Sequence, residues 1–376
     1  MPGTATPPSP FMDYPARQRV LQATLARNRL DALLVSHPPN IRYLCGFTGS
    51  AGALLVTEKS AVFFTDGRYT IQARNEVSGA RVVIARKAAL TAAADWMAPR
   101  AKQFGCKTYC RLGVEGQHLS LNAYRQLAAT LGSDFRVTSA PPIVEEMRAI
   151  KDSEEIQHIR SAAVLGASLF PQMLKLISSR VNETEVAGEV EHAARKAGAE
   201  GMSFPTIIVS GERSALPHGQ PANEAIRSNG FVVCDFGVIL TGYCSDRTRT
   251  VYVGRPTPEA HRVYQAVREA GQAALESVRP GTSLGEVDSA ARKLLQKQGL
   301  GKYFTHSTGH GVGLEIHEAP RVAAGQTELL QPGMVITIEP GVYLPGKWGV
   351  RIEDMVLVTG DGYEVLAPSS TELIAV

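Results

Sequence analysis

Three histidines in the carboxyl-terminal half of the chain lie close enough in sequence to act together. His306, His310 and His317 fall within thirteen residues, 306–318, which also hold three glycines. A Gly-rich loop with incidental histidines would account for one such residue. Three of them, close to carboxylates and within apolar segments, favour a catalytic stretch instead.

The same stretch is expected to form a β-strand. A glycine inside a helix costs about 1 kcal/mol relative to alanine, and Val312, Leu314 and Ile316 alternate with other residues, which is typical of a strand. A strand places His310, Leu314 and Ile316 on one side and His317 on the other, unless a bulge at the glycines turns them.

Four acidic residues lie at matching places in two expected hairpins. Asp235 lies inside an apolar run, where a bare carboxylate is costly to bury without a cation or several donors. Asp246 follows eleven positions later on the return arm, so the two can form a cross-strand pair. Glu339 and Glu353 repeat the arrangement with longer side chains. Each acid alone could cap a strand or pair with an arginine, but all four together with His310 favour one site.

Electrostatics predicts that this site holds metal. Four ionised carboxylates at a few ångströms cannot all stay ionised without counterions, and two divalent cations cancel their charge while His310 stays neutral. Oxygen donors with one imidazole favour Mn²⁺, with Zn²⁺, Co²⁺ and Fe²⁺ as alternatives. Two such cations can activate water and polarise a carbonyl, so the residues predict a two-metal site that hydrolyses amide bonds.

The segments that must position these residues are expected to form two domains. The chain has 376 residues, of which 44% are hydrophobic, enough for two cores. Strands alternating with helices over residues 13–145 predict an α/β domain. Residues 150–376 twice present two helices followed by a carboxylate-bearing hairpin. Residues 1–12, rich in Pro, Thr and Ser, are expected to be a disordered lead-in and not a signal peptide.

The sequence pattern assigns individual elements within both domains. In the amino-terminal domain we expect helices over 14–30, 69–76, 91–103 and 121–131, strands over 31–36, 52–57, 61–65, 81–85 and 112–115, and a break at 37–40. In the carboxyl-terminal domain we expect helices over 153–176, 183–197, 258–278 and 283–298, a strand over 206–210, and hairpins over 231–253 and 334–358. The histidine stretch then lies between the last helix and the second hairpin.

Composition restricts the partners and the compartment. The net charge is +3 and no run of five or six like charges occurs, so neither nucleic acid nor a membrane is an expected partner. No apolar run approaches the roughly 18 residues that span a bilayer. Five cysteines, without the spacing of a disulfide framework, predict a reduced, cytoplasmic protein. Cys106 and Cys110 could form a metal pair, but no second Cys/His pair accompanies them.

Several motifs carry a resemblance to a known family. They are Leu-Pro-His-Gly at 216–219, His-Ser-Thr-Gly-His-Gly at 306–311, Ile-Glu-Pro-Gly at 338–341 and Val-Arg-Ile-Glu-Asp at 350–354. With Asp235 and Asp246, they closely resemble the pita-bread metallopeptidases, and within these the Xaa-Pro peptidases, aminopeptidase P and prolidase. Segments 42–50 and 64–69 are similar to the amino-terminal domain of bacterial Xaa-Pro peptidases.

The resemblance implies an α+β fold and a metal-ligand set. A pita-bread catalytic domain of two pseudo-symmetric helix–hairpin halves would follow a smaller α/β creatinase/prolidase-like domain. Asp235, as a bidentate ligand, and Glu353 would hold the metals, Asp246 and Glu353 would bridge them, and His310 and Glu339 would complete one. Glu339 would also carry a proton from the nucleophile to the leaving nitrogen.

The resemblance also assigns residues to the substrate. His218 and His317 would contact it and stabilise the tetrahedral intermediate, and His306 would line the proline side of the pocket. Arg351 would fix a ligand glutamate or meet a substrate carboxylate. Arg321 would clamp a free carboxylate through a bidentate fork, unless it is a solvated loop arginine.

The implied activity is cleavage between an N-terminal residue and a following proline in small peptides, by a homodimer. The amino-terminal motifs favour an aminopeptidase P that accepts longer peptides, whereas the short interval from Glu339 to Glu353 is typical of dipeptidases such as prolidase. Both remain open. A binding protein that keeps the fold without chemistry would have lost ligands, and none is lost here. A creatinase-like amidinohydrolase or a phosphotriesterase-like activity on the same metals is the remaining alternative.

Overall fold

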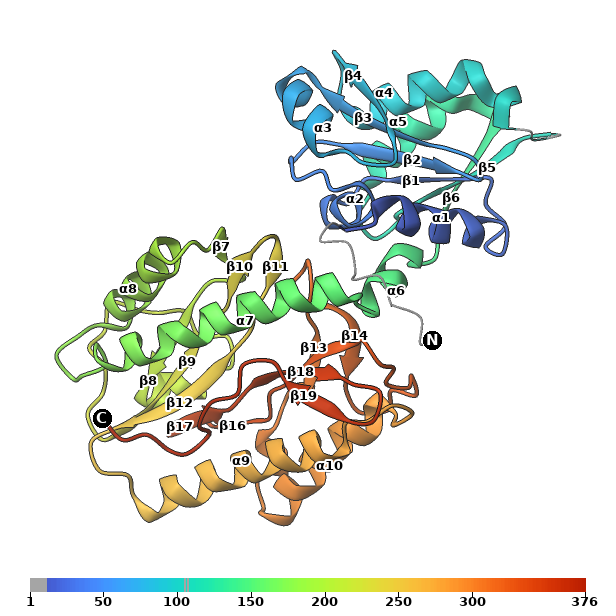
Figure 1. Ribbon diagram of the computed structural model, residues 1–376. Helices are drawn as coiled ribbons and strands as arrows, with labels where there is room; N and C mark the ends of the chain where they lie inside the picture. The colour runs from blue at the N-terminus through green and yellow to red at the C-terminus, as the bar shows by residue number, and fades with distance from the viewer. Residues whose placement is uncertain (1–11, 105, 107) are drawn as a thin grey trace, which may run out of the picture. The chain divides into compact units, whose positions relative to one another are not determined.

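The chain folds into two compact units that meet in sequence between Arg148 and Ala149. The structure is a computed structural model and describes residues 12–104, 106 and 108–376; the expected lead-in over 1–12 lies almost entirely outside them. Figure 1 shows the helices and strands of both units. Within the described ranges, no helix is both long and apolar enough to cross a membrane.

The amino-terminal unit is built on one six-stranded sheet with the order β4-β3-β2-β1-β5-β6. Its strands are β1 (Ala32–Val35), β2 (Ala53–Thr57), β3 (Ala61–Asp66), β4 (Arg81–Ala85), β5 (Cys110–Val114) and β6 (Phe135–Ser139). The pairs β1–β2 and β2–β3 are antiparallel, whereas β3–β4, β1–β5 and β5–β6 are parallel. Parallel neighbours require crossover connections, which explains the helices between them.

Six α-helices lie in the described residues of this part of the chain. They are α1 (Tyr14–Leu25), α2 (Pro38–Cys45), α3 (Thr70–Glu76), α4 (Ala89–Met97), α5 (Leu121–Leu131) and α6 (Ile143–Ala149), the last of which runs into the second unit. Figure 1 shows α4 and α5 on one face of the sheet and α1 and α2 on the other. Buried strand residues such as Leu34, Leu55 and Leu112 pack with Ala93 and Leu127 to form the core.

Four expectations for this unit are wrong. The first helix ends at Leu25 instead of Leu30. The helix expected over 91–103 ends at Met97, and a 3-10 helix over Ala98–Phe104 follows it. A break was expected at 37–40, yet α2 begins there with His37 as its N-cap residue and prolines in its first turn. Proline is tolerated at that place because its missing N–H would have no helical partner. The strand β6 was not expected, although Phe135 and Val137 alternate toward the core.

The cysteines also differ from expectation. Cys106 and Cys110 form a disulfide, with their Cα atoms 5.3 Å apart, so the prediction of a fully reduced chain is wrong for this pair. Among the described cysteines, Cys45, Cys234 and Cys244 are buried and take no part in a disulfide. Because the disulfide removes the argument from cysteine count, a cytoplasmic location stays a prediction.

The second unit contains two successive helix–hairpin halves, as the sequence predicted. The first half comprises α7 (Ser153–Leu174), α8 (Glu183–Lys196), β7 (Gly201–Met202), β8 (Ile207–Ser210), β9 (Gly230–Asp235), β10 (Val238–Leu240), β11 (Tyr243–Cys244) and β12 (Thr248–Val253). The second comprises α9 (Pro258–Ser277), α10 (Leu284–Lys297), β13 (Gly309–Gly311), β14 (Glu318–Val322), β15 (Val335–Ile338), β16 (Gly341–Leu344), β17 (Trp348–Arg351), β18 (Asp354–Val358) and β19 (Tyr363–Val365).

Local sequence explains where the helices of this unit begin. Capping boxes start α7 with Asp152 and Glu155, and α10 with Ser283 and Glu286. In such a box each side chain accepts a hydrogen bond from the other residue's backbone N–H, which satisfies donors that the helix leaves free. The helices cover the outside of the strands (Figure 1), so each half has its own apolar core.

Each hairpin is interrupted, so that an outer strand pair is followed by a separate inner pair. β9 pairs with β12 and β10 with β11, while β15 pairs with β18 and β16 with β17. At the first break, a Cβ on Gly237 would lie 1.7 Å from the carbonyl oxygen of Ser245, so only glycine fits there. At the second break stands Pro340, which has no N–H to donate to a strand ladder.

Candidate metal centre

The breaks in the two hairpins carry the acidic residues. Asp235 is the last residue of β9 and Asp246 lies between β11 and β12. Glu339 follows β15, and Glu353 lies between β17 and β18. At a break the side chain is released from the strict alternation of a strand, so acids from both hairpins can point into one space.

The expected direct pairing of Asp235 with Asp246 is wrong, because Asp235 lies opposite Thr248 in the β9–β12 register. Asp246 instead approaches residues of the other half. One ligand atom each from Asp246, His310 and Glu353 lie within 4.8 Å of one another. His310 Nε2 is 3.5 Å from Asp246 Oδ2 and 3.6 Å from Glu339 Oε1.

Burial and mutual repulsion raise the pKa values of these acids. Burial is the main reason why the pKa of Asp246 lies well above its ordinary value, and Glu353 adds repulsion. Burial and the charge of Glu353 raise the pKa of Glu339 in the same way. For Glu353 itself, burial and the neighbouring Asp235 raise the pKa to about 8. The protein alone therefore does not stabilise four negative charges here.

The donor set fits divalent cations. Asp235 Oδ1 is buried and has no hydrogen-bond partner within the described ranges, so an oxygen lone pair is left for a ligand from outside the chain. Burial lowers the pKa of His310 to about 4, which keeps the imidazole neutral and able to ligate at neutral pH. Four carboxylates with one imidazole suit a moderately hard cation.

Arg351 places a positive side chain next to the acids of the metal centre. Its guanidinium donates to Asp235 Oδ2, to Thr248 Oγ1 at 3.1 Å and to the hydroxyl of Tyr343 at 2.7 Å. Thr248 Oγ1 in turn donates to Glu353 Oε2 at 2.7 Å. One buried arginine thus orients acids from both halves, directly or through a threonine.

A cavity of about 700 Å³ contains this centre. All ten residues that the sequence singled out line it: His218, Asp235, Asp246, His306, His310, His317, Arg321, Glu339, Arg351 and Glu353. Burial lowers the pKa of His306 to about 4. The pKa of His317 is also lowered, because the cavity wall partly removes its ring from water and His218 is nearby. Both rings are therefore neutral at pH 7.

The histidine stretch is not the continuous strand that was expected. β13 ends at Gly311, and its pairing with β14 shifts register between His310 and Gly311. This is the bulge that the sequence left open. It brings His317 back to His310, with ring centroids 4.2 Å apart. Glycine is needed at the bulge, since a Cβ on Gly311 would lie 2.2 Å from the carbonyl oxygen of Ala319 on the facing strand.

Sequence reasoning missed the side chains that orient the predicted ones. Tyr343 is buried, at 5% exposure, and its hydroxyl lies 3.0 Å from His306 Nε2. Burial raises the pKa of Tyr343 to about 12, so it stays a hydrogen-bond donor. Thr248 lies in an ordinary strand pattern. The only available signal was spacing, because Tyr343 follows Glu339 by four residues in the same hairpin.

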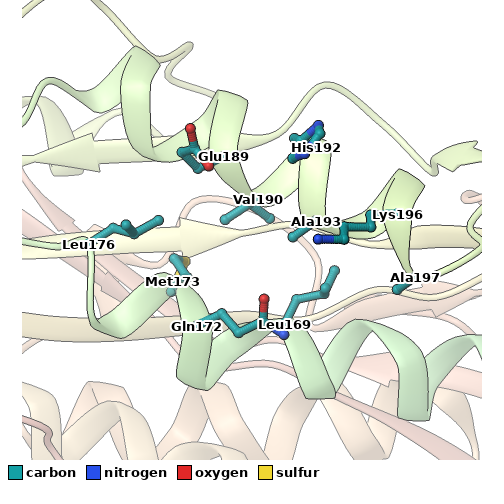
Figure 2. A pocket seen from close by; sticks show the side chains of 10 residues that line it. All are labelled: Leu169, Gln172, Met173, Leu176, Glu189, Val190, His192, Ala193, Lys196 and Ala197. Atoms are coloured by element: carbon teal, nitrogen blue, oxygen red, sulfur yellow. The ribbon is translucent and has the colours of Figure 1, made fainter.

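A second hollow, of about 490 Å³, lies between α7 and α8. Figure 2 shows its ionisable side chains, Glu189, His192 and Lys196, on α8, while Leu169 and Met173 face them from α7. The three ionisable groups are of mixed charge and come from one helix. This groove lacks the converging acids that distinguish the larger cavity.

Two family models together span most of the chain. The model of metallopeptidase family M24 matches residues 157–360, and that of the creatinase/prolidase N-terminal domain matches residues 17–150. The predicted fold class, a pita-bread unit preceded by a smaller creatinase/prolidase-like domain, is therefore confirmed. The Bacillus subtilis peptidase YqhT is 39% identical over 345 residues, which cover 92% of this chain and 96% of that relative.

Solved structures agree over nearly the full length. The Xaa-Pro dipeptidase from Bacillus anthracis has a TM-score of 0.90 at 38% identity and covers 97% of this chain and 99% of its own. The prolidase from Pyrococcus horikoshii has a TM-score of 0.87 at 36% identity, and the match covers 96% of this chain and 100% of that one. The X-Pro aminopeptidase from Thermotoga maritima has a TM-score of 0.85 at 33% identity, and the match covers 94% of this chain and 100% of that one.

The family match and the donor set lead to the same conclusion. The matched segment contains every acidic residue and histidine that lines the cavity, and the expectation of a metal-dependent peptidase is confirmed. The chain belongs to metallopeptidase family M24.

Proposed function

We propose that the chain is a Xaa-Pro dipeptidase that works with two divalent cations. We expect Mn²⁺ in preference to Zn²⁺, Co²⁺ or Fe²⁺. The observation that carries the proposal is the shared cavity wall: five metal-donor side chains, three further histidines and two arginines face one space. The similarity to Xaa-Pro dipeptidase and prolidase structures supports the substrate class.

Asp235, Asp246, His310, Glu339 and Glu353 are the proposed metal ligands. The orphaned oxygen of Asp235 and the raised pKa values of the other three acids support this assignment. Two cations balance the four carboxylate charges. When bound, they supply activation of water and polarisation of the scissile carbonyl.

The remaining residues have roles in proton transfer and orientation. Glu339 accepts a proton from the attacking water and passes it to the leaving nitrogen; its carboxylate lines the cavity and lies 3.6 Å from His310 Nε2. His218 and His317, neighbours on the cavity wall, donate hydrogen bonds to the oxyanion of the tetrahedral intermediate. His306 lines the proline side, and Arg351 keeps Asp235 in place.

Arg321 supports a dipeptide as the substrate. It lies across from His310 in the β13–β14 pair and lines the cavity, and its guanidinium makes no hydrogen bond or ion pair with the described part of the chain. A free guanidinium beside the metal ligands suits the terminal carboxylate of a dipeptide. We therefore prefer dipeptidase to aminopeptidase P, which the amino-terminal motifs alone had favoured.

The experiment compares Ala-Pro, Ala-Pro-Ala, the amide Ala-Pro-NH₂ and Ala-Ala after chelation and reloading with Mn²⁺. We expect hydrolysis of Ala-Pro, little of the tripeptide or amide, and none of Ala-Ala. Arg321→Met should raise KM for Ala-Pro and leave the slow amide reaction unchanged. Equal hydrolysis of the tripeptide would favour aminopeptidase P, and inactivity on all four would contradict an Xaa-Pro peptidase.

The assembly and compartment rest on the sequence alone. A cytoplasmic homodimer without nucleic-acid or membrane partners remains the prediction. Light scattering of the purified, metal-loaded chain measures its mass, for which we expect twice the 40.3 kDa of one chain.

A further inference from the structure

Each half of the catalytic unit contains a buried acid paired with an arginine outside the metal centre. In the first half, Glu183 at the start of α8 is 0% exposed. Its Oε1 accepts from Ser210 N at 2.7 Å, and its Oε2 accepts from Ala222 N at 3.0 Å and from Arg213 Nε at 3.1 Å. Arg213 also donates to the carbonyl oxygen of Gln220.

These bonds close the segment 210–222 at both of its ends. His218 is exposed within that segment and lines the cavity. The carbonyl oxygen of Pro217 accepts a hydrogen bond from Arg351 Nη1 at 3.0 Å. The segment is thus held by Glu183 at its base and by the metal-centre arginine next to the histidine.

In the second half, Asp288 on α10 is 1% exposed. Its Oδ1 accepts from Thr308 Oγ1 at 2.8 Å, and both of its oxygens accept from Arg292, at 2.8 and 2.9 Å. Arg292 donates further to the carbonyl oxygens of Phe304 at 3.1 Å and His306 at 3.0 Å. The pair therefore holds the backbone on both sides of His306 and the peptide of His306 itself.

The two pairs share a chemical pattern that helix packing alone does not require. A buried ion pair seldom adds net stability compared with apolar packing. Both pairs nevertheless direct their hydrogen bonds to the backbone of segments that carry a cavity histidine. The second segment also meets the metal centre, since Glu339 N donates to Thr308 O at 2.7 Å.

We propose that Asp288–Arg292 and Glu183–Arg213 are equivalent positioning pairs, one in each half, that hold His306 and His218 against the substrate. The inference rests on the proposed function only where the histidines are said to contact substrate. Moving a histidine that contacts the substrate by about 1 Å lowers the rate roughly a hundredfold. A histidine on an irregular segment therefore needs the hydrogen bonds of such a pair to keep its position.

The test compares Arg292→Met with Lys293→Met, a matched exposed residue on the same helix. We measure hydrogen–deuterium exchange, metal content, melting temperature and kcat on Ala-Pro. Arg292→Met should speed exchange at 304–309 about tenfold or more, because the segment loses the hydrogen bonds that the guanidinium donates to the carbonyl oxygens of Phe304 and His306. It should also lower kcat by at least about tenfold. Metal content and exchange at 335–344 should match wild type, and Arg292→Lys should recover part of kcat.

Each alternative outcome has a distinct meaning. Unchanged exchange at 304–309 overturns the positioning role, whatever the activity. The positioning role is also overturned if exchange becomes faster throughout the unit and, in addition, Lys293→Met loses as much kcat or Arg292→Lys recovers none. The pair would then only stabilise the fold. If Arg292→Met does not fold, Asp288→Asn gives the same comparison. A wild-type chain that cleaves no Xaa-Pro substrate contradicts the proposed function but leaves the exchange result valid.

The first half supplies an independent repetition. Arg213→Met should speed exchange within 210–222 and lower kcat. The control variant Glu212→Gln, at the exposed neighbouring residue, should match wild type in both measurements. An effect confined to the second half would overturn the equivalence of the two pairs.

Discussion

Two buried acidic sites, one in each unit, differ in what surrounds them. In the amino-terminal unit, Glu115 is 8% exposed and accepts hydrogen bonds from His37 N and from Asn40 Nδ2, both at 2.7 Å. Ser36 adds its backbone N–H and its hydroxyl. Arg148 donates to Asn40 Oδ1 at 2.7 Å and continues the network. The chain itself provides the donors that this carboxylate needs.

The metal centre of the catalytic unit buries more carboxylates with fewer donors for each. Burial raises the pKa values of Asp246, Glu339 and Glu353, and neighbouring carboxylates, Asp235 among them, add to each shift. Asp235 Oδ1 has no hydrogen-bond partner in the described part of the chain. Buried charge alone is therefore a poor sign of function, whereas buried charge that the chain does not compensate indicates a ligand from outside.

The strongest test of this contrast removes one of the uncompensated acids. Asp246→Ala and Glu353→Ala should abolish hydrolysis of Ala-Pro and lower the metal bound per chain, because each removes a charge that holds the cations. Asp361→Ala, an exposed acid in the turn before β19, is the control and should retain both. Metal analysis and kcat are measured on the same preparations. Full turnover with two metals in either variant would contradict the dinuclear assignment.

The second prediction separates ligation from proton transfer at one residue. Glu339→Gln should lower kcat by about 10²–10⁴-fold while metal content falls less, since the amide oxygen can ligate weakly but cannot carry a proton. The measurement is kcat at saturating Mn²⁺ together with metal per chain. Turnover equal to wild type would remove Glu339 from the proton-transfer step.

The acids of the metal centre were predictable from sequence, because an acidic residue in an apolar run must be buried and a buried charge is costly without a counterion or donors. Asp235 lies inside an apolar run and Glu339 ends one, and that pattern is local. The breaks that direct them were not predictable, since the one at Gly237 depends on contact with Ser245 across the hairpin. Tyr343 was missed for the same reason, because its partners His306 and Arg351 meet it only in the folded chain.

The fold was predictable to the extent that local signals determine it. The helices expected over 153–176, 183–197 and 283–298 agree with α7, α8 and α10 to within a few residues, and the structure shows a capping box at the start of each. The pair Pro38–Pro39 was ambiguous, because prolines both interrupt a chain and begin a helix, and only tertiary packing of Ile41 and Leu44 decides. The pairing of Cys106 with Cys110 likewise needed the folded geometry.

The third prediction concerns the histidines on the cavity wall. His218→Ala and His317→Ala should each lower kcat by about 10²–10³-fold, the loss typical of a missing oxyanion donor. Both side chains are exposed and outside the ligand set, so metal content and melting temperature should match wild type. A variant that loses activity only along with its metal or its fold would show that the histidine is structural.

The fourth prediction is a pH dependence of stability that metal removes. In the metal-free chain, Glu353 has a folded pKa of about 8 against an ordinary value near 4.5, so the folded state holds a proton that the unfolded state has released. Its stabilising contribution is complete below about pH 4.5 and is lost as pH rises through 8. Melting temperature should therefore fall from pH 5 to pH 8 without metal, and less with Mn²⁺. An equal slope in both forms would contradict uncompensated charge.

The smallest expected effect is on the melting temperature of two matched variants, one in each acidic site. They are Glu353→Gln and Glu115→Gln, measured in the metal-free chain at pH 8. Glu353→Gln should raise the melting temperature by a few degrees, because it removes repulsion and its amide oxygen can still accept from Thr248. Glu115→Gln should lower it by roughly 3–10 °C, or about 1–3 kcal/mol, since an amide group then faces backbone N–H donors. Calorimetry gives both values, and the same sign for the two variants would show that the sites do not differ as argued.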